Sequence, residues 1–303
     1  MSPDEREKRL TVLATFGLLA MTAVWGSTFV LIKDVLNRMP VADFLAVRFS
    51  VAALVMLALF ARPVLRLGRP QLMRGLLLGT VYGAGQLLQT WGLSLIAPSV
   101  SGFVTGMYVV FTPMLATVLL RHRMDGRVWL AVVLATGGLA LLSLNGLSVN
   151  SGVWLTLASA LLYGLHLVGL GQWSRPGEAF GMSAVQMVAI AVVCLLATAP
   201  HGPMLPPDRS AWLAVLYMAL IAGAGAMLMQ TWAQSHLPAA RAAIVMTTEP
   251  VFAAGFAVAF GSDLLTWRML VGGGLVLAAM YLVELMPRRG DSPLPAEAIH
   301  HEV

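Results

Sequence analysis

Cysteine and charge are both scarce in this chain of 303 residues, and each scarcity excludes something. Cys194 is the single cysteine, so no intramolecular disulfide can form and cysteine usage does not indicate a redox compartment. Charged residues make up 11% of the chain, whereas hydrophobic residues make up 58%. The mean hydropathy of +0.82 excludes a water-soluble domain, because no core could bury so much apolar surface. The composition therefore predicts a polytopic membrane protein.

Sequence signatures of catalysis and nucleotide binding are missing as well. The sequence contains no GxxxxGK[ST] loop, no HExxH pair and no Cys/His zinc spacing. We therefore expect no single-chain ATP-driven pump, no enzyme, no cofactor and no metal site. The net charge of +5 does not indicate a nucleic-acid partner, because the basic residues are scattered between apolar segments instead of forming a patch.

Ten apolar segments of roughly 18 to 25 residues are each long enough to cross the hydrocarbon of a bilayer as a helix. They span residues 10–32, 41–60, 72–95, 100–120, 128–147, 152–170, 182–199, 211–235, 239–260 and 266–286. The first segment is too long for a signal-peptide core, so we expect it to stay in place as a helix. The polar, proline-rich tail of residues 287–303 is expected to be disordered.

Positive residues predict the orientation, because Lys and Arg are retained on the cytoplasmic side of a membrane. With the leader of residues 1–9 inside, the inside segments hold 14 Lys and Arg, whereas the outside segments hold 4. Both termini are therefore predicted to be cytoplasmic.

Two copies of one pattern occur about 140 residues apart. The run GAGQLLQTW of residues 83–91 matches GAGAMLMQTW of residues 223–232, and Pro113 matches Pro250. The predicted repeats are residues 10–147 and residues 152–286, with five helices each. Because five is odd, the second repeat must enter the membrane upside down, which is the inverted-repeat architecture of secondary transporters. The predicted fold is thus an all-α polytopic membrane protein of ten transmembrane helices in two inverted five-helix repeats.

Polar side chains recur every three or four residues along several of these segments, so each set forms a stripe on one helix face. Because unpaired polar groups in hydrocarbon cost several kcal/mol, the stripes predict one shared cavity. The predicted substrate-binding residues are Trp25, Thr28, Tyr82, Gln86, Gln89, Ser101, Thr105, Tyr108, Tyr163, His166, Gln230 and Gln234. The alternative is structural: Ser and Thr can bond back to their own helix, and Gln can join two helices.

Three ionisable residues and two prolines lie deep in the predicted helices. Glu249 is predicted to carry a proton or bind a substrate amine, with a structural ion pair or a water-bound carboxylate as the alternatives. His166 either titrates or donates a hydrogen bond. Arg48 is interpreted as an interfacial or ion-paired residue whose long stem lets it reach the membrane surface. Pro113 and Pro250 are the predicted gating hinges, because proline bends a helix.

Glycines at four-residue spacing predict close helix packing. Gly75, Gly79 and Gly83 share one face of the third segment, where we expect packing within the chain. Gly272 to Gly274 in the last segment are a second candidate for helix contact between chains. Monomer and homodimer therefore both stay open.

Four short runs together resemble the EamA-type branch of the drug/metabolite transporter superfamily. They are Trp25-Gly-Ser-Thr-Phe, Arg48-Phe49, Phe111-Thr-Pro113 and Thr248-Glu-Pro-Val-Phe252. The resemblance covers about residues 10–286 and implies a ten-helix inverted-repeat fold in the bacterial inner membrane, with a cavity framed by helices 1, 3, 4, 6, 8 and 9. The chain departs from the family where a Gly-Glu pair is usual, with Arg121-His-Arg after helix 4 and Gly261-Ser-Asp263 after helix 9.

The pattern and the resemblance together predict a secondary transporter that works by alternating access in the cell inner membrane. Neutral or zwitterionic metabolites, such as amino acids, are the expected substrates, and export is the expected direction. The expected partners are this small molecule, the lipid bilayer and protons. The alternatives are a passive channel or facilitator, an exporter of other small organic solutes or drugs, and a receptor or scaffold that binds a ligand without moving it.

Overall fold

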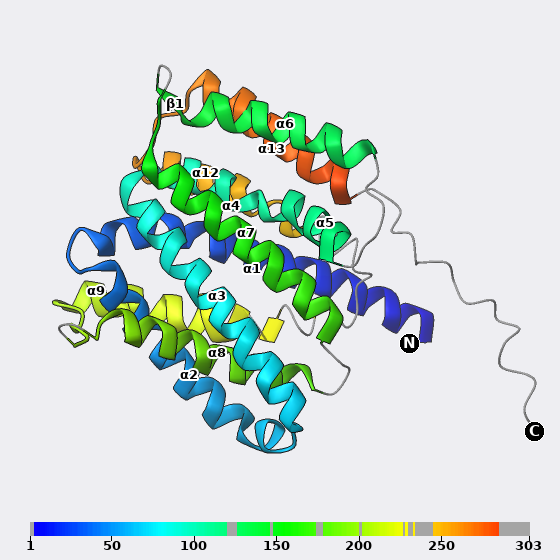
Figure 1. Ribbon diagram of the computed structural model, residues 1–303, viewed down its shortest axis with the longest axis vertical. Helices are drawn as coiled ribbons and strands as arrows, with labels where there is room; N and C mark the ends of the chain where they lie inside the picture. Colours follow the sequence, from blue (N-terminus) through cyan, green and yellow to red (C-terminus); the bar gives the residue numbers. More distant parts are fainter. Residues whose placement is uncertain are drawn as a thin grey trace, which may run out of the picture.

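The computed structural model describes residues 3–119, 126–145, 148–173, 178–199, 202–226, 228–229, 233 and 245–284. These residues are helical apart from short connections and one small hairpin (Figure 1). The first half of the chain forms α1 (Pro3–Leu36), α2 (Val41–Leu65), α3 (Arg69–Leu95), α4 (Pro98–Gly106), α5 (Tyr108–Leu119) and α6 (Gly126–Ser143). The second half forms α7 (Ser151–Trp173), α8 (Ala179–Ala197), α9 (Arg209–Leu216), the π-helix η1 (Tyr217–Gly225), α12 (Glu249–Ala259) and α13 (Trp267–Glu284).

Five helices in the described ranges are long and apolar enough to cross a membrane. They contain Arg9–Leu36, Val41–Leu65, Pro98–Leu119, Ser151–Leu170 and Phe180–Ala197. Shorter apolar helices cover Trp129–Leu142, Arg209–Gly225, Glu249–Ala259 and Trp267–Leu282. The chain is therefore a helical, multi-pass membrane protein.

Three predicted segments differ from the helices that form. Residues 100–120 are divided into α4 and α5 by a turn at Met107. Residues 128–147 were predicted to be helical throughout, but α6 ends at Ser143, and strand β1 (Leu144–Asn145) pairs antiparallel with β2 (Ser148–Val149). The segment 211–235 begins as α9 and continues as a π-helix. The tail of residues 287–303 lies outside the described residues, whereas residues 3–9 of the leader continue directly into α1.

The two halves contact each other in a reciprocal pattern. Corresponding helices pack together, α2 against α8 and α6 against α13, and the latter pair lies side by side at the top of Figure 1. The first helix of each half packs against the other half: α7 contacts α3, α4 and α5, while α1 contacts η1 and α12. Exchanging the halves therefore reproduces most of these contacts, as expected for a chain built from two copies of one pattern.

One glycine in the first helix of each half, Gly26 in α1 and Gly164 in α7, allows a close helix contact. A Cβ at Gly26 in α1 would lie 2.6 Å from the Cβ of Phe252 in α12. A Cβ at Gly164 in α7 would likewise lie 3.3 Å from the Cβ of Phe111 in α5. The lack of a side chain at these two glycines thus lets α1 approach α12, and α7 approach α5, closely.

The glycine stripe of α3 packs within the chain, as expected. A Cβ at Gly79 would lie 2.5 Å from the carbonyl oxygen of Gln186 in α8, so α3 and α8 are in backbone contact there. Gly272 also contacts its own chain, because a Cβ there would lie 2.8 Å from the carbonyl oxygen of Gly138 in α6. Gly272 is therefore in close contact with α6 of its own chain.

Polar side chains fix several helix ends on one side of the molecule. The Lys33 Nζ donates to the carbonyl oxygens of Leu93 and Ser94 at 2.8 Å and of Ile96 at 2.9 Å, so it caps the end of α3. Asp263 Oδ2 accepts from the backbone N–H of Ser99 at 3.0 Å and caps the start of α4. The loop that lacks the usual Gly-Glu pair thus makes its own helix cap.

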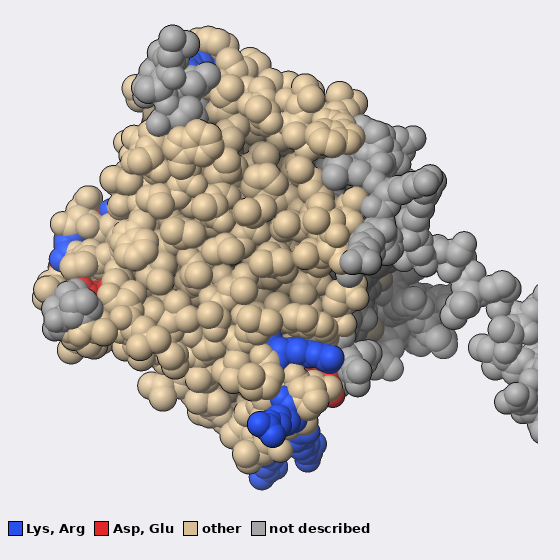
Figure 2. Space-filling view, in the orientation of Figure 1, with Lys and Arg blue, Asp and Glu red and all other residues tan. Residues whose placement is uncertain are grey.

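The outer surface is largely apolar, as the bilayer requires. Side chains such as Leu54, Val118 and Leu196 are more than two-thirds exposed, which is expected of groups that face lipid. Figure 2 shows a wide band without charged residues across one face, and Lys and Arg gather at its lower end over the turn between α2 and α3. Arg62, Arg66 and Arg69 are the exposed cations of this turn.

Candidate functional site

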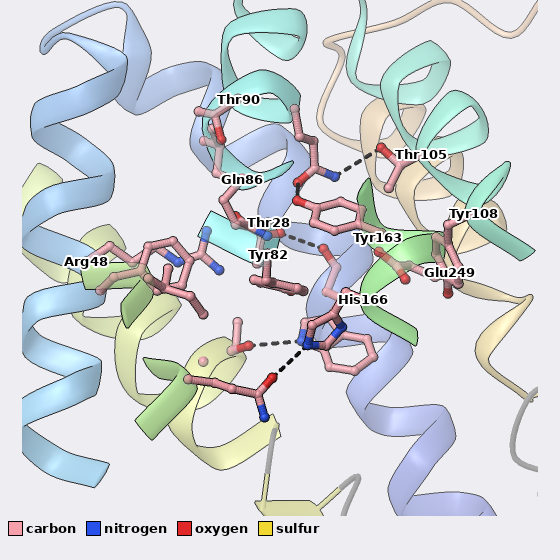
Figure 3. Close-up of a pocket in the computed structure, with 18 of the residues that line it drawn as sticks. Thr28, Arg48, Tyr82, Gln86, Thr90, Thr105, Tyr108, Tyr163, His166 and Glu249 are labelled. Carbon is pink, nitrogen blue, oxygen red and sulfur yellow. Dashed lines mark hydrogen bonds between the residues drawn. The ribbon is translucent and has the colours of Figure 1, made fainter. Parts of the chain in front are cut away.

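A cavity of about 210 Å³ lies where the two halves meet. Helices α1, α2, α3, α4 and α5 of the first half and α7, α8, η1 and α12 of the second half all contribute lining residues (Figure 3). The polar and aromatic lining side chains are Trp25, Thr28, Phe29, Arg48, Phe49, Tyr82, Gln86, Gln89, Thr90, Thr105, Tyr108, Tyr163, His166, Ser183, Gln186 and Glu249. Such a mixture of rings and a few polar groups is typical of a small-molecule site.

Most of the residues predicted from the polar stripes meet at this cavity. Trp25, Thr28, Tyr82, Gln86, Gln89, Thr105, Tyr108, Tyr163, His166 and Glu249 all line it. Ser101 is not among the lining residues: its side chain is fully buried, and its Oγ lacks a hydrogen-bond partner. Gln230 and Gln234 lie outside the described residues.

Gln89 is held between the two halves by hydrogen bonds at both ends of its amide. Its Nε2 donates to Thr105 Oγ1 at 3.0 Å, and its Oε1 accepts from the Tyr163 hydroxyl at 2.9 Å (Figure 3). The network therefore connects α3, α4 and α7. An amide fixed at both ends keeps one orientation, which a site that recognises a polar solute requires.

Aromatic rings form the middle of the cavity. The Tyr82 ring lies 5.0 Å from that of Tyr163 and 5.0 Å from that of His166, measured between centroids. His166 Nε2 is 2.7 Å from Gln186 Oε1, so α7 and α8 are also joined by a hydrogen bond. The polar stripes of the sequence included His166 but missed Gln186. Ser183 is the next polar residue along the same face of α8, and two polar residues in an apolar segment are too few to be recognised as a stripe.

The π-helix η1 supplies a backbone acceptor that the sequence pattern did not reveal. Trp25 Nε1 donates to the carbonyl oxygen of Ala222 at 2.9 Å, and Ala222 and Gly223 both line the cavity. A π-helix is rare and is frequently found at functional sites. The wider turn of a π-helix changes which backbone carbonyls are free to accept a hydrogen bond from a side chain. The periodicity of hydrophobic residues in the sequence does not indicate this change of hydrogen-bond register.

Back-bonding applies to at least four hydroxyls in the stripes, those of Thr28, Thr112, Thr156 and Ser159. Thr28 Oγ1 donates to the carbonyl oxygen of Trp25 at 2.7 Å, and Thr112 Oγ1 donates to that of Tyr108 at 2.7 Å. Each hydroxyl proton is thus used within its own helix, as the structural alternative predicted. The Thr28 oxygen still faces the cavity, where it can accept a hydrogen bond.

Arg48 and Glu249 lie on opposite walls of the cavity, on α2 and α12 (Figure 3). The interpretation of Arg48 as an interfacial or ion-paired residue is wrong for the described part of the chain. Its side chain is only 7% exposed, it lines the cavity, and the ion pairs found among the described residues do not include it. The side chain faces the cavity between the two halves, and α8 packs against α2.

Both predicted hinge prolines follow an interruption of their helix. Pro113 lies within α5, six residues after the turn at Met107, and only its backbone is described. Pro250 lies in the first turn of α12, directly after the turn at Thr247 and Thr248. Proline was expected to bend a continuous helix in the ninth predicted segment, residues 239–260. The helix is instead interrupted just before α12, which begins at Glu249.

These features define the class of the protein: a multi-pass membrane protein with a polar and aromatic cavity between two related groups of helices. A family model described as the EamA-like transporter family matches the chain twice, over residues 12–144 and 150–285. The chain therefore belongs to the EamA-like transporter family. This match confirms the EamA-type resemblance of the four short sequence runs. Each half of the chain is one family repeat.

Named relatives span nearly the whole chain. An uncharacterized transporter of Archaeoglobus fulgidus is 30% identical over 93% of this chain and 88% of its own length. A probable terminal-alkyne amino-acid exporter of Streptantibioticus cattleyicolor is 25% identical over 93% of this chain and 97% of its own length. The uncharacterized inner membrane transporter YedA of Escherichia coli is 26% identical over 90% of this chain and 92% of its own length.

The fold itself has been seen in a crystal structure. That structure matches with a TM-score of 0.62 at 21% sequence identity, over 93% of this chain and 99% of the other. At this identity the likeness concerns the fold alone.

Proposed function

We propose that this chain is a secondary transporter that exports small neutral or zwitterionic metabolites, amino acids or related compounds, across the cell inner membrane by alternating access. The observation that carries the proposal is the cavity between the two repeats, with its fixed amide at Gln89 and its rings at Tyr82 and Tyr163. A site between repeats is where alternating access needs the substrate. The relative named as an amino-acid exporter supports this substrate class.

The reciprocal contacts of the two halves support the inverted arrangement. α1 crosses α12 and α7 crosses α5 in the same way, and each second helix packs on its counterpart. Rocking one repeat against the other would leave the cavity residues in place while opening it to alternate sides. The helix breaks before Pro113 and Pro250 are the places where the gating helices bend in this proposal.

Orientation and coupling complete the proposed mechanism. The cationic turn between α2 and α3 faces the cytoplasm, together with both termini, because it carries the dense cluster of Arg62, Arg66 and Arg69. Glu249, whose carboxylate is the acidic group in the cavity lining, is the proposed proton carrier. Proton binding there and solute binding nearby would then be linked through the same cavity.

Counter-flow in proteoliposomes tests the proposal. Radiolabelled neutral and aromatic amino acids should exchange saturably through the wild-type protein, and Gln89→Ala should lower this exchange strongly. Glu249→Gln should keep exchange but lose stimulation by a pH gradient. Arg62→Gln, at the exposed end of α2, is the matched control and should behave as wild type. Conductance without saturable counter-flow would instead favour a channel.

A further inference from the structure

Arg48 is a buried cation with an incomplete set of partners. Its Nε is buried without a hydrogen-bond partner, and the ion pairs found in the described part of the chain leave its guanidinium out. Its Cζ lies 5.0 Å from the centroid of the Phe49 ring and 5.9 Å from that of Phe44. Ring faces attract the cation but cannot accept the N–H bonds that lie in the guanidinium plane.

A guanidinium at this depth needs an anion. Arginine keeps its charge in proteins, and an uncompensated charge away from water is strongly unfavourable. Arg48 lines the cavity, so an acceptor can reach its donors by entering that space (Figure 3). A carboxylate fits best, because its two oxygens match the two parallel N–H bonds of a guanidinium.

Glu249 indicates whether the solute in the cavity carries an ammonium group in addition to its carboxylate. It lines the same cavity, yet it is not within 4.0 Å of the basic groups of the described residues, Arg48 included. In Figure 3 the rings of Tyr82 and Tyr163 lie between the two charged groups. A solute with only a carboxylate would leave the Glu249 carboxyl group without a cationic partner among the described residues, whereas a zwitterion presents an ammonium group as well.

We infer that Arg48 binds the carboxylate of the transported solute and so selects zwitterions over amines that lack a carboxylate. This assignment rests on the proposed function, whose cavity it uses. The apolar body of the solute then lies against Tyr82 and Tyr163, and its ammonium group faces the Glu249 wall. Arg48 is thus a specificity-determining residue, because it distinguishes solutes that carry a carboxylate from those that do not.

The test compares phenylalanine with phenethylamine, which has the same ring and ammonium group but no carboxylate. Each is used unlabelled to compete with radiolabelled phenylalanine in counter-flow through the full-length protein in proteoliposomes. Each is also tested for thermal stabilisation of the detergent-purified protein. The variants are Arg48→Gln, Arg48→Lys and, as the control on the same helix, Arg62→Gln.

Wild type and Arg62→Gln should prefer phenylalanine by about thirtyfold or more, the range expected when one partner of a buried charge pair is missing. Arg48→Gln should reduce this preference to about one while its affinity for phenethylamine stays near that of wild type. Arg48→Lys should retain an intermediate preference, because it keeps the charge but loses the two-pronged geometry. This variant also preserves the comparison where Arg48→Gln does not fold.

Equal weakening of both compounds in Arg48→Gln, or an unchanged preference, would overturn the assignment while leaving the proposed transport function intact. Absence of counter-flow for every amino acid in the wild type would instead remove the proposed function. Stabilisation then decides the role of Arg48 by itself: selective stabilisation by phenylalanine that Arg48→Gln abolishes supports it, and stabilisation without selection contradicts it.

Discussion

At the scale of single residues, the site depends on side chains whose orientation is fixed by a neighbour. Gln89 is the clearest case, because Thr105 and Tyr163 hold the two ends of its amide. The Tyr163 hydroxyl has no other role in the described hydrogen bonds, so its contribution can be removed without changing the ring. This separates orientation of the amide from the packing of the aromatic cluster.

Tyr163→Phe should therefore weaken solute exchange without unfolding the protein. Loss of one net hydrogen bond of about 1 kcal/mol corresponds to about a fivefold rise in the concentration for half-maximal counter-flow. The ring contact with Tyr82 is kept, so stability in detergent should fall only slightly. Tyr281→Phe on α13, away from the cavity lining, is the control. An unchanged half-maximal concentration in Tyr163→Phe would show that the fixed amide does not matter for binding.

At the scale of helices, the contact between α3 and α8 is one of the extensive contacts between the two halves. Gly79 sets this distance, because a Cβ there would lie 2.5 Å from the Gln186 carbonyl oxygen and 2.7 Å from the Ala189 Cβ. Backbone cannot move aside as a flexible side chain can. Gln186 also holds His166, so a shift of α8 would reach the cavity.

Gly79→Ala should destabilise the protein by about 1–3 kcal/mol through overpacking, in spite of the better helix propensity of alanine. The measurement is the melting temperature in detergent, with counter-flow as a second readout. Gly255→Ala on α12 is the matched control, because a Cβ there meets nothing within 4 Å. Equal melting temperatures for the two variants would contradict the close approach of α3 and α8.

Because a carboxylate caps the start of α9, we expect the stability of the protein to depend on pH. Asp208 caps this helix, and the Ser210 hydroxyl, the Ala211 N–H and then Arg38 hold the pKa of Asp208 at about 2, below its ordinary value of 3.8. Because the folded pKa is the lower one, the stabilisation is complete above about pH 4 and is lost as the pH falls toward 2. Asp208→Asn keeps the cap acceptor but not the charge. The melting-temperature difference between wild type and Asp208→Asn should thus shrink from pH 4 to pH 2, and a constant difference would contradict this account.

At the scale of the whole molecule, sequence periodicity predicted much of the cavity. Tyr82, Gln86 and Gln89 were found because polar residues on one face of an apolar helix must meet other polar groups. Arg48 was misjudged because a long side chain on an isolated helix can reach the membrane surface, whereas in the fold this side chain is buried and lines the cavity. Which wall a single charge faces is a tertiary property.

Other features were beyond reach of the pattern for local reasons. The break at Met107 and the π-helix η1 change hydrogen-bond register without changing the apolar composition of their segments. Ser101 fits the stripe of its helix, but it lies one turn before Thr105, is fully buried and does not line the cavity. A stripe of period 3.6 assumes an unbroken helix, and the turn at Met107 separates Ser101 and Thr105 from Tyr108.

The measurement that most directly tests the central claim is two-sided labelling of the cavity. Cys194→Ser removes the native thiol, and Thr28→Cys then places a single thiol in the lining. A membrane-impermeant maleimide added to either side of oriented proteoliposomes should label this thiol, and an exchanged solute should protect it from both sides. Labelling from one side alone under all conditions, or labelling unaffected by solute, would contradict a substrate site that opens alternately to each side.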